Sequence, residues 1–270
     1  PPNFGGGFNV GGQVGASGNN PVGIVASLSY NAETEQVNDR QFAFVSDTAN
    51  GTPDKQLTFD ETHSIVDLGG IFNVATRLGL SNQLAFKNFY TRNAEEVFFS
   101  GTGYDAESNL DQVQDYQVLY VERSLLQSQL SGSHLLASSS DARLDWKVTY
   151  ASATRDEPDN RQARYGRVGT GPYSLSFTRP NYSWFRYLED QIASGQVDWA
   201  QPVSLRAAGD GQLKVGALYR GRHRNFDAQS FVFTPLASPT PSSYVTLQPE
   251  QAFAPENIGS NMSVARLNGR

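Results

Sequence analysis

The chain has 270 residues, a formal net charge of −6, 25 Gly, 16 Phe, 12 Tyr and no Cys. The acidic balance disfavours a nucleic-acid partner, and the lack of cysteine excludes a disulfide scaffold and thiol chemistry. No apolar run approaches the roughly 18 to 20 residues of a membrane helix, which excludes a helical membrane protein. A membrane β-barrel stays open, because half of each of its strands is polar.

Period-two alternation predicts four strands in the first half of the chain. Short turns are predicted at residues 18–21 and 79–82, with a longer polar connection around residues 47–53. The residues that share the apolar face of each strand are, in chain order, Val10, Gly12, Val14 and Ala16; Val22, Ile24, Ala26, Leu28 and Tyr30; Val66, Leu68, Phe72, Val74 and Leu78; and Leu84, Phe86 and Tyr90.

The second half repeats this arrangement. A fifth strand is predicted over residues 116–131, a sixth over residues 144–152, a seventh over residues 197–205 and an eighth over residues 213–222. Pro202 indicates that the seventh strand is distorted. The domain prediction adds two long loops, at about 155–196 and 234–270, and no strand is expected after Thr234. In the first loop, Trp184, Leu188 and Ile192 fall near helical spacing, which indicates a short helix.

The clearest alternation lies in the sixth strand. Leu144, Trp146, Val148 and Tyr150 share one face, while Asp145, Lys147 and Thr149 share the other. A wall between lipid and water has this pattern, and so does a half-buried strand of a soluble sandwich. Trp146, Tyr150, Tyr219, Tyr90 and Tyr30 would anchor a barrel at the membrane interfaces.

Connection lengths favour the membrane barrel over the sandwich. Short turns on one side and long connections on the other are typical of outer-membrane barrels, and nine residues suffice for a tilted strand to cross the hydrocarbon layer. The predicted fold class is therefore all-β, an antiparallel transmembrane β-barrel segment of about eight strands. With periplasmic short turns, both chain ends lie outside the cell, so residues 1–270 are expected to be a middle portion of a larger barrel.

Several segments resemble TonB-dependent outer-membrane receptors. The run LDWKVTYASATRDEPDNR, within residues 125–165, carries most of the resemblance, and residues 20–31, 84–96 and 253–259 are similar to the same family in the same order. The resemblance implies a barrel of 22 strands, a plug domain, and energy from TonB through a periplasmic motif. Neither plug nor motif is present here, so TonB is expected to act through a missing N-terminal part.

No catalytic constellation is present, and the chain is not expected to be an enzyme or to hold a cofactor. His63, His134 and His223 are far apart in the sequence and are expected to be solvated or hydrogen-bonded rather than metal ligands. The cluster of Asp156, Glu157 and Asp159 lacks the spacing of a calcium loop. Pairing with Arg155 and Arg161 is the preferred interpretation, although a Ca²⁺ site stays open.

Two sets of residues are candidates for function. Asp145, Lys147, Lys214, Arg220 and Arg222 are predicted to face the lumen, where the basic residues could guide an anionic substrate, hold a plug or pair with neighbouring acids. Leu144, Trp146, Val148 and Tyr150 are predicted to face lipid. Ligand contacts are assigned to four aromatic residues of the first long loop, which are Tyr173, Tyr182, Trp184 and Tyr187.

The functional hypothesis is a receptor that imports a metal chelate or a glycan across the outer membrane of a Gram-negative bacterium. Its expected partners are outer-membrane lipid, the remainder of the barrel, a plug domain, TonB and a small-molecule or glycan substrate, with no nucleic acid. The alternative is a soluble or surface-exposed β-sandwich that serves as a binding or structural module. The barrel requires its apolar face to be exposed, whereas the sandwich requires apolar faces packed on each other.

Overall fold

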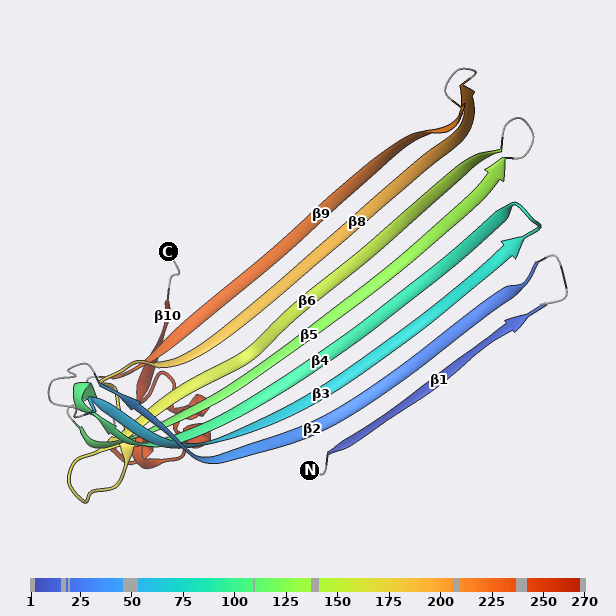
Figure 1. Ribbon diagram of the computed structural model, residues 1–270. Helices are drawn as coiled ribbons and strands as arrows, with labels where there is room; N and C mark the ends of the chain where they lie inside the picture. Colours follow the sequence, from blue (N-terminus) through green and yellow to red (C-terminus); the bar gives the residue numbers. More distant parts are fainter. Residues whose placement is uncertain are drawn as a thin grey trace.

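A computed structural model describes residues 3–15, 18, 20–45, 53–108, 110–136, 141–205, 209–236 and 242–267. These residues form one antiparallel sheet of ten strands, which confirms the all-β prediction (Figure 1). The strands are β1 (Phe4–Val14), β2 (Val22–Phe44), β3 (Lys55–Leu78), β4 (Asn82–Asp105), β5 (Leu110–Leu136), β6 (Ala142–Arg167), β7 (Ser174–Leu175), β8 (Asn181–Leu205), β9 (Gly209–Pro235) and β10 (Met262–Leu267).

The sheet is an up-and-down meander. Its strand order is β1-β2-β3-β4-β5-β6-β8-β9-β10, and the short β7 pairs with β6 alone. The eight strands expected from alternation appear in order as β1 to β6, β8 and β9. Within the described ranges no ladder joins β1 to β9 or β10, so the sheet has two open edges.

The strands are much longer than alternation predicts. β2 to β6, β8 and β9 each contain 23 to 27 residues. The predicted loop over residues 155–196 is wrong, because β6 continues to Arg167 and β8 begins at Asn181. The predicted helix is also wrong, since Trp184, Leu188 and Ile192 pair with β9 residues along a continuous antiparallel ladder.

A β-bulge explains why the alternation was lost there. The β6–β8 register shifts between Glu157 and Asn160, while the β8–β9 register runs unbroken, so the extra residue lies in β6. Pro158, which cannot donate to a ladder, falls inside the bulge. Beyond it the odd and even positions of β6 exchange faces, and a period-two pattern read through this point fails.

Connections differ at the two ends of the sheet, as predicted. The hairpins that follow β1, β3, β5 and β8 have short connections and lie at the upper right of Figure 1. At the opposite end, the connections after β2, β6 and β9 are longer, while the one after β4 is short and contains η1 (Ala106–Ser108). Three short helical segments near the C-terminus, η2 (Ser242–Thr246), α1 (Pro249–Ala252) and η3 (Pro255–Asn257), also lie at this end. We call these the turn end and the loop end.

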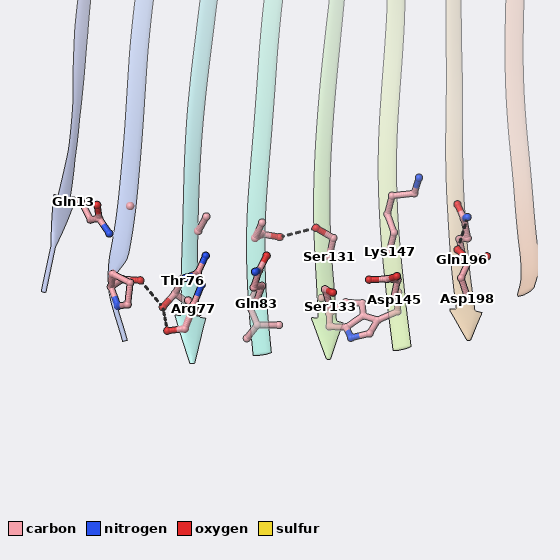
Figure 2. Close-up of a pocket in the computed structure, with 17 residues that line it drawn as sticks. Gln13, Thr76, Arg77, Gln83, Ser131, Ser133, Asp145, Lys147, Gln196 and Asp198 are labelled. Atoms are coloured by element: carbon pink, nitrogen blue, oxygen red, sulfur yellow. Dashed lines mark hydrogen bonds between the residues drawn. The ribbon is translucent and has the colours of Figure 1, made fainter. Parts of the chain in front are cut away.

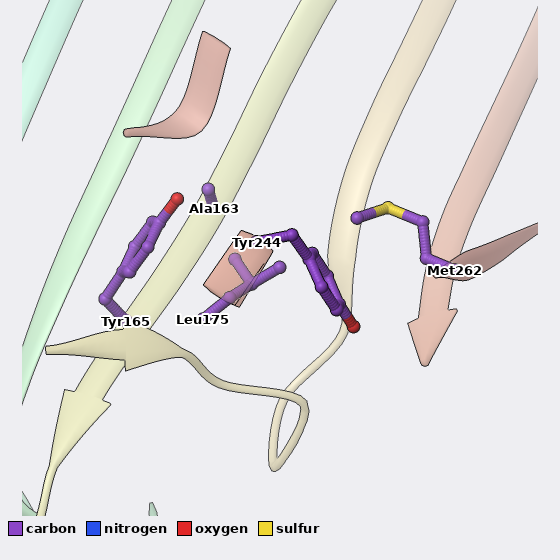
Figure 3. Close-up of a cluster of buried hydrophobic side chains, with 5 residues drawn as sticks. All are labelled: Ala163, Tyr165, Leu175, Tyr244 and Met262. Carbon is purple, nitrogen blue, oxygen red and sulfur yellow. The ribbon is translucent and has the colours of Figure 1, made fainter. Parts of the chain in front are cut away.

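The segment after Thr234 is not without a strand. β10 pairs with the end of β9, and the helical segments before it cover the sheet at the loop end. The buried apolar cluster lies there, where Tyr165 and Ala163 of β6 and Leu175 of β7 pack with Tyr244 and Met262 (Figure 3). Of the described helices, none has the length and apolarity to span a membrane.

Close backbone approach at the loop end depends on Gly103 of β4. A Cβ atom there would overlap the carbonyl group of Gln56 on β3. We therefore expect Gly103→Ala to force these strands apart and to cost about 1 to 3 kcal/mol of stability, as overpacking does elsewhere. Gly6→Ala, where a Cβ would meet nothing, is the matched control. Chemical denaturation checks the pair, and equal midpoints would contradict the expectation.

Candidate functional site

The pairing register assigns side chains to two faces, because residues directly opposite each other on neighbouring strands point the same way. Asp145 of β6 lies opposite Ser133 and Asp198, and Lys147 lies opposite Ser131 and Gln196. Figure 2 shows these side chains projecting together from β5, β6 and β8. We call this side of the sheet the polar face.

The polar face is hollowed near the turn end. A shallow cavity of about 620 Å³ extends over β1 to β8. The polar side chains of this face that line it are Gln13, Arg77, Gln83, Ser131, Ser133, Asp145, Lys147, Gln196 and Asp198 (Figure 2). These closely spaced amide, hydroxyl and carboxylate groups can form hydrogen bonds with water or with a polyhydroxylated solute. Among these side chains, no nucleophile is paired with a base.

The predicted lumen residues of β9 lie on the same polar face. Lys214 is opposite Ala200, which is opposite Arg143, and Arg220 and Arg222 follow at alternate positions. Arg222 Nε donates to Asp190 at 2.7 Å and Arg224 Nη2 does so at 2.6 Å. These two hydrogen bonds hold the pKa of Asp190 well below its usual range.

Ordinary pairing therefore accounts for part of the basic row. In the described ranges, Lys214 and Arg220 form no ion pair, so they are the two cations of β9 left to act on a solute. A separate series of side-chain hydrogen bonds runs from β3 to β5. In it, Asn93 donates a hydrogen bond to Asp67, and Arg123 donates one to Asn93 at 2.9 Å.

The opposite side of the sheet is apolar and open. Val148 is 55% exposed, Leu28 56% and Val215 62%, with no second layer of sheet over them in the described structure. The predicted lipid-facing residues Leu144, Trp146, Val148 and Tyr150 are all on this side. The apolar band at the turn end comprises Val22, Ile24, Ala26, Leu28, Leu68, Phe72, Val74, Leu84, Phe86, Leu126, Leu130, Leu144, Trp146, Val148, Val197, Trp199, Leu213, Val215 and Ala217.

Polar groups inside the apolar band are bonded to one another. Trp146 Nε1 donates to His134 Nε2 at 3.0 Å, and His134 Nδ1 lies 2.7 Å from Asn82 Oδ1. Ser128 donates to Asn88 Oδ1 at 2.6 Å, and the Asn88 amide donates to a backbone carbonyl. Such pairing is what an environment without water requires.

Four tyrosines border the band on the side away from the turns. Residues that face each other across successive strands form a row, which we name by its residue in β6. Tyr150 itself belongs to β6. Tyr219 lies in the row of Val148, Tyr90 in the row of Ser152 and Tyr30 in the row of Thr154. Each tyrosine is two strands from the next, so the line steps by one residue per strand. With roughly 3.3 Å per residue and 4.8 Å between strands, that line makes an angle of about 35° with the ladder.

At the turn end, the first residues of the strands lie on a line parallel to the line of tyrosines. Val22 of β2 lies on the row of Trp146, Asn82 of β4 lies on the row of Leu144, and Ala142 begins β6. Each start is nine residues from its tyrosine, counted inclusively as 22–30, 82–90 and 142–150. The apolar band therefore has a constant height across these strands.

The apolar side becomes polar just beyond the tyrosines. Arg92, the next residue on this side past Tyr90, forms an ion pair with Glu122, which lies one residue pair further along the sheet, with a 2.5 Å contact. The pKa of Glu122 is lowered, mainly by the hydrogen bond from Arg92. On β9, the same side carries Gly221, His223 and Asn225 beyond Tyr219. The tyrosines thus mark a boundary between two chemical environments.

A buried ion network holds the loop end together on the polar face. Arg164 donates two hydrogen bonds of 2.6 Å to Asp115 and one of 2.7 Å to Asp105. Burial alone would lower the pKa of Arg164, but the bonds to the two carboxylates outweigh it and the pKa is raised. The side chains of Arg164 and Asp105 are only 4% and 1% exposed.

The four aromatic ligand candidates do not form one cluster. Tyr173 lies between β6 and β7, where its hydroxyl donates to Gln112 at 2.9 Å and Arg167 lies over its ring. Tyr182, Trp184 and Tyr187 belong to β8 rather than to a loop, and Tyr187 points to the other side of the sheet from its neighbours at even positions. The placement of these three residues in a loop is therefore wrong, and strand alternation separates Tyr187 from the other two. Their contact with a ligand stays a prediction.

The acidic cluster is neutralised within the sheet. Arg155 contacts Glu157 at 2.7 Å, Arg161 pairs with Asp159, and Arg186 lies 3.6 Å from Glu157. These residues lie in β6 and β8 rather than in a loop. His63 contacts Glu61 at 2.9 Å, and no group of three His, Asp or Glu in the described ranges is arranged to hold a metal ion.

Sequence reasoning missed the ion network of Arg164 and the cover formed by residues 244–262. Asp105, Asp115 and Arg164 are separated by up to 59 positions in the sequence, so no local pattern connects them; only strand register does. Comparison with known proteins adds no further assignment: no family model, no curated protein and no solved structure matches the chain.

Proposed function

We propose that the chain forms part of the wall of a TonB-dependent outer-membrane receptor, a β-barrel that imports a nutrient such as a metal chelate or a glycan. In this assignment the apolar band faces lipid, the polar face lines the lumen, and the loop end extends outside the cell. A plug domain inside the barrel and TonB in the periplasm are the proposed partners.

The apolar band bounded by four tyrosines carries this proposal. Transmembrane strands of about 9 to 11 residues, tilted by roughly 35 to 45°, cross the hydrocarbon layer, and aromatic residues gather at its interfaces. The band is nine residues high, which is the length of a transmembrane strand, and its tyrosine border is inclined by about 35°, which is the tilt of such strands. Both values come from the same strand pairing. A sheet in water has no reason to keep these tyrosines on one slanted line.

The sandwich alternative is disfavoured by the same side of the sheet. A sandwich buries the apolar faces of two sheets against each other at about 10 Å separation. In the described ranges there is one sheet, and its apolar residues at the turn end are exposed. The buried apolar cluster is confined to the loop end.

Cysteine labelling in whole cells tests the lipid and lumen assignments. Single substitutions at Asp145 and Lys147 are expected to react with a membrane-impermeant maleimide supplied to an open lumen, while those at Trp146 and Val148 stay unlabelled because lipid covers them. The four positions are adjacent, so differences in expression or depth are small. Equal labelling of both pairs would contradict the barrel.

Uptake measurements test the transport assignment. Cells that express the full-length protein should lose uptake of its substrate when the proton-motive force is dissipated, because TonB carries energy from the inner membrane. Cells expressing an unrelated passive porin serve as the control. Uptake that persists without the proton-motive force would show a passive pore. That result would contradict the TonB-dependent transport assignment but not the barrel assignment.

A further inference from the structure

A second cavity lies on the apolar side of the sheet at the loop end, apart from the polar face. Its volume is about 710 Å³, within the roughly 300 to 1,000 Å³ of small-molecule sites. The sheet forms its floor through β4, β5, β6, β8 and β9, and residues 249–264 form its cover. Just before this cover, the Leu247 carbonyl accepts a 2.8 Å hydrogen bond from the Tyr165 hydroxyl, which ties the segment to β6.

Aromatic residues contribute seven of the 18 residues that line the cavity, and several of their rings pack on one another. Phe185 packs edge-on against Phe231 with ring centroids 5.8 Å apart, and Phe233 lies 4.8 Å from Phe253. Phe98 and Tyr116 also line the cavity, and Phe98 remains 41% exposed. These mutually packed rings give a preformed apolar surface whose faces carry negative partial charge.

The charged groups at the cavity are predominantly acidic. Glu96, Asp159 and Glu250 line it together with one cation, Arg161. Arg161 Nε already donates to Asp159 at 2.9 Å, so this pair is neutral overall. Within the described residues, Glu96 and Glu250 form no ion pair. With three carboxylates and one guanidinium, the lining has a net charge of −2 beside the aromatic wall.

We propose that this cavity binds a small organic cation that bears an aromatic or other apolar group. The rings would contact the apolar part and stack on the cationic centre, while Glu96 and Glu250 would compensate its charge. An anionic lipid or a phosphate would instead meet two carboxylates at the rim. The site requires only the observed fold, and it is independent of the proposed transport through the lumen.

Calorimetric titration of the purified full-length protein with benzyltriethylammonium tests the proposal. Saturable binding is expected, and benzenesulfonate, an aromatic anion, should not bind. The double variant Glu96→Gln with Glu250→Gln keeps the side-chain shape and should weaken cation binding about tenfold, the loss expected from about 1.4 kcal/mol. Phe253→Ala should weaken binding as well, because it removes one wall of the cavity.

Glu256→Gln is the matched control, because Glu256 lies in the same C-terminal segment and does not line the cavity. It should bind the cation as the wild type does. The proposal is overturned if the wild type does not bind the cation, if the anion binds equally well, or if the double variant and Glu256→Gln bind alike. Since transport is not measured, none of these outcomes bears on the uptake function.

Discussion

Replacing Arg164 by Met should destabilise the loop end by about 3 to 5 kcal/mol, because it leaves buried carboxylates without their partner. Asp115 would lose both of its short hydrogen bonds, and Asp105 would keep the Glu107 backbone N–H at 3.2 Å and the more distant Arg179 at 3.5 Å. Hydrogen exchange measured by mass spectrometry on β4, β5 and β6 reports the local opening free energy, and faster exchange should be confined to the loop end.

Arg155→Met is the control for this substitution. Arg155 lies on the same strand but is half exposed, and its partner Glu157 retains contacts with Arg186 and Asn160. Its loss should therefore cost no more than about 1 kcal/mol. Combining Arg164→Met with Asp105→Asn and Asp115→Asn should recover stability. Unchanged exchange in the Arg164 variant would mean that the network does not hold the loop end.

Replacing Ala26 by Arg should cost about 2 to 4 kcal/mol if the apolar band lies in lipid. Ala26 is the central residue of 22–30 on the apolar side of β2, so its side chain would be near the bilayer midplane. Denaturant titration of the protein refolded into lipid vesicles measures the effect. In a sheet surrounded by water the same change at this surface position should be nearly neutral.

Two further variants test whether the cost depends on depth in the bilayer and on the side of the sheet. Val148→Arg lies two residues from Tyr150, nearer the interface, and should cost less than Ala26→Arg. Val25→Arg, on the polar face beside Ala26, should cost under about 1 kcal/mol. Three equal values would remove the distinction between lipid and lumen on which the proposed function rests.

Local alternation was enough to find eight of the ten strands in chain order. The segment from Leu144 to Tyr150 alternates cleanly because one side meets an apolar environment and the other a polar one. The same rule failed beyond the tyrosines, where charged and apolar residues mix on the apolar side of the sheet, so the strands continue without a regular alternation. It also failed at Pro158, where one extra residue exchanges the faces.

The candidate functional residues could be predicted where strand alternation was sufficient, and could not be predicted where strand register was needed. Asp145, Lys147, Lys214, Arg220 and Arg222 were correctly placed on one face, since period two suffices for that. Tyr182, Trp184 and Tyr187 were assigned to a loop, because the spacing of Trp184, Leu188 and Ile192 in the same segment resembles a helical one in isolation. The line of Tyr30, Tyr90, Tyr150 and Tyr219 could not be identified before the register was known, since it exists only between strands.

The step of one residue per strand also sets the size of the opening that such a wall would enclose. At a slope of about 35°, each strand occupies roughly 5.9 Å of circumference, so 22 strands would close at a diameter near 40 Å. An unobstructed hole of that width would let antibiotics and detergents pass freely. A receptor built on this wall would need a plug to keep the membrane an effective permeability barrier while it admits a single nutrient.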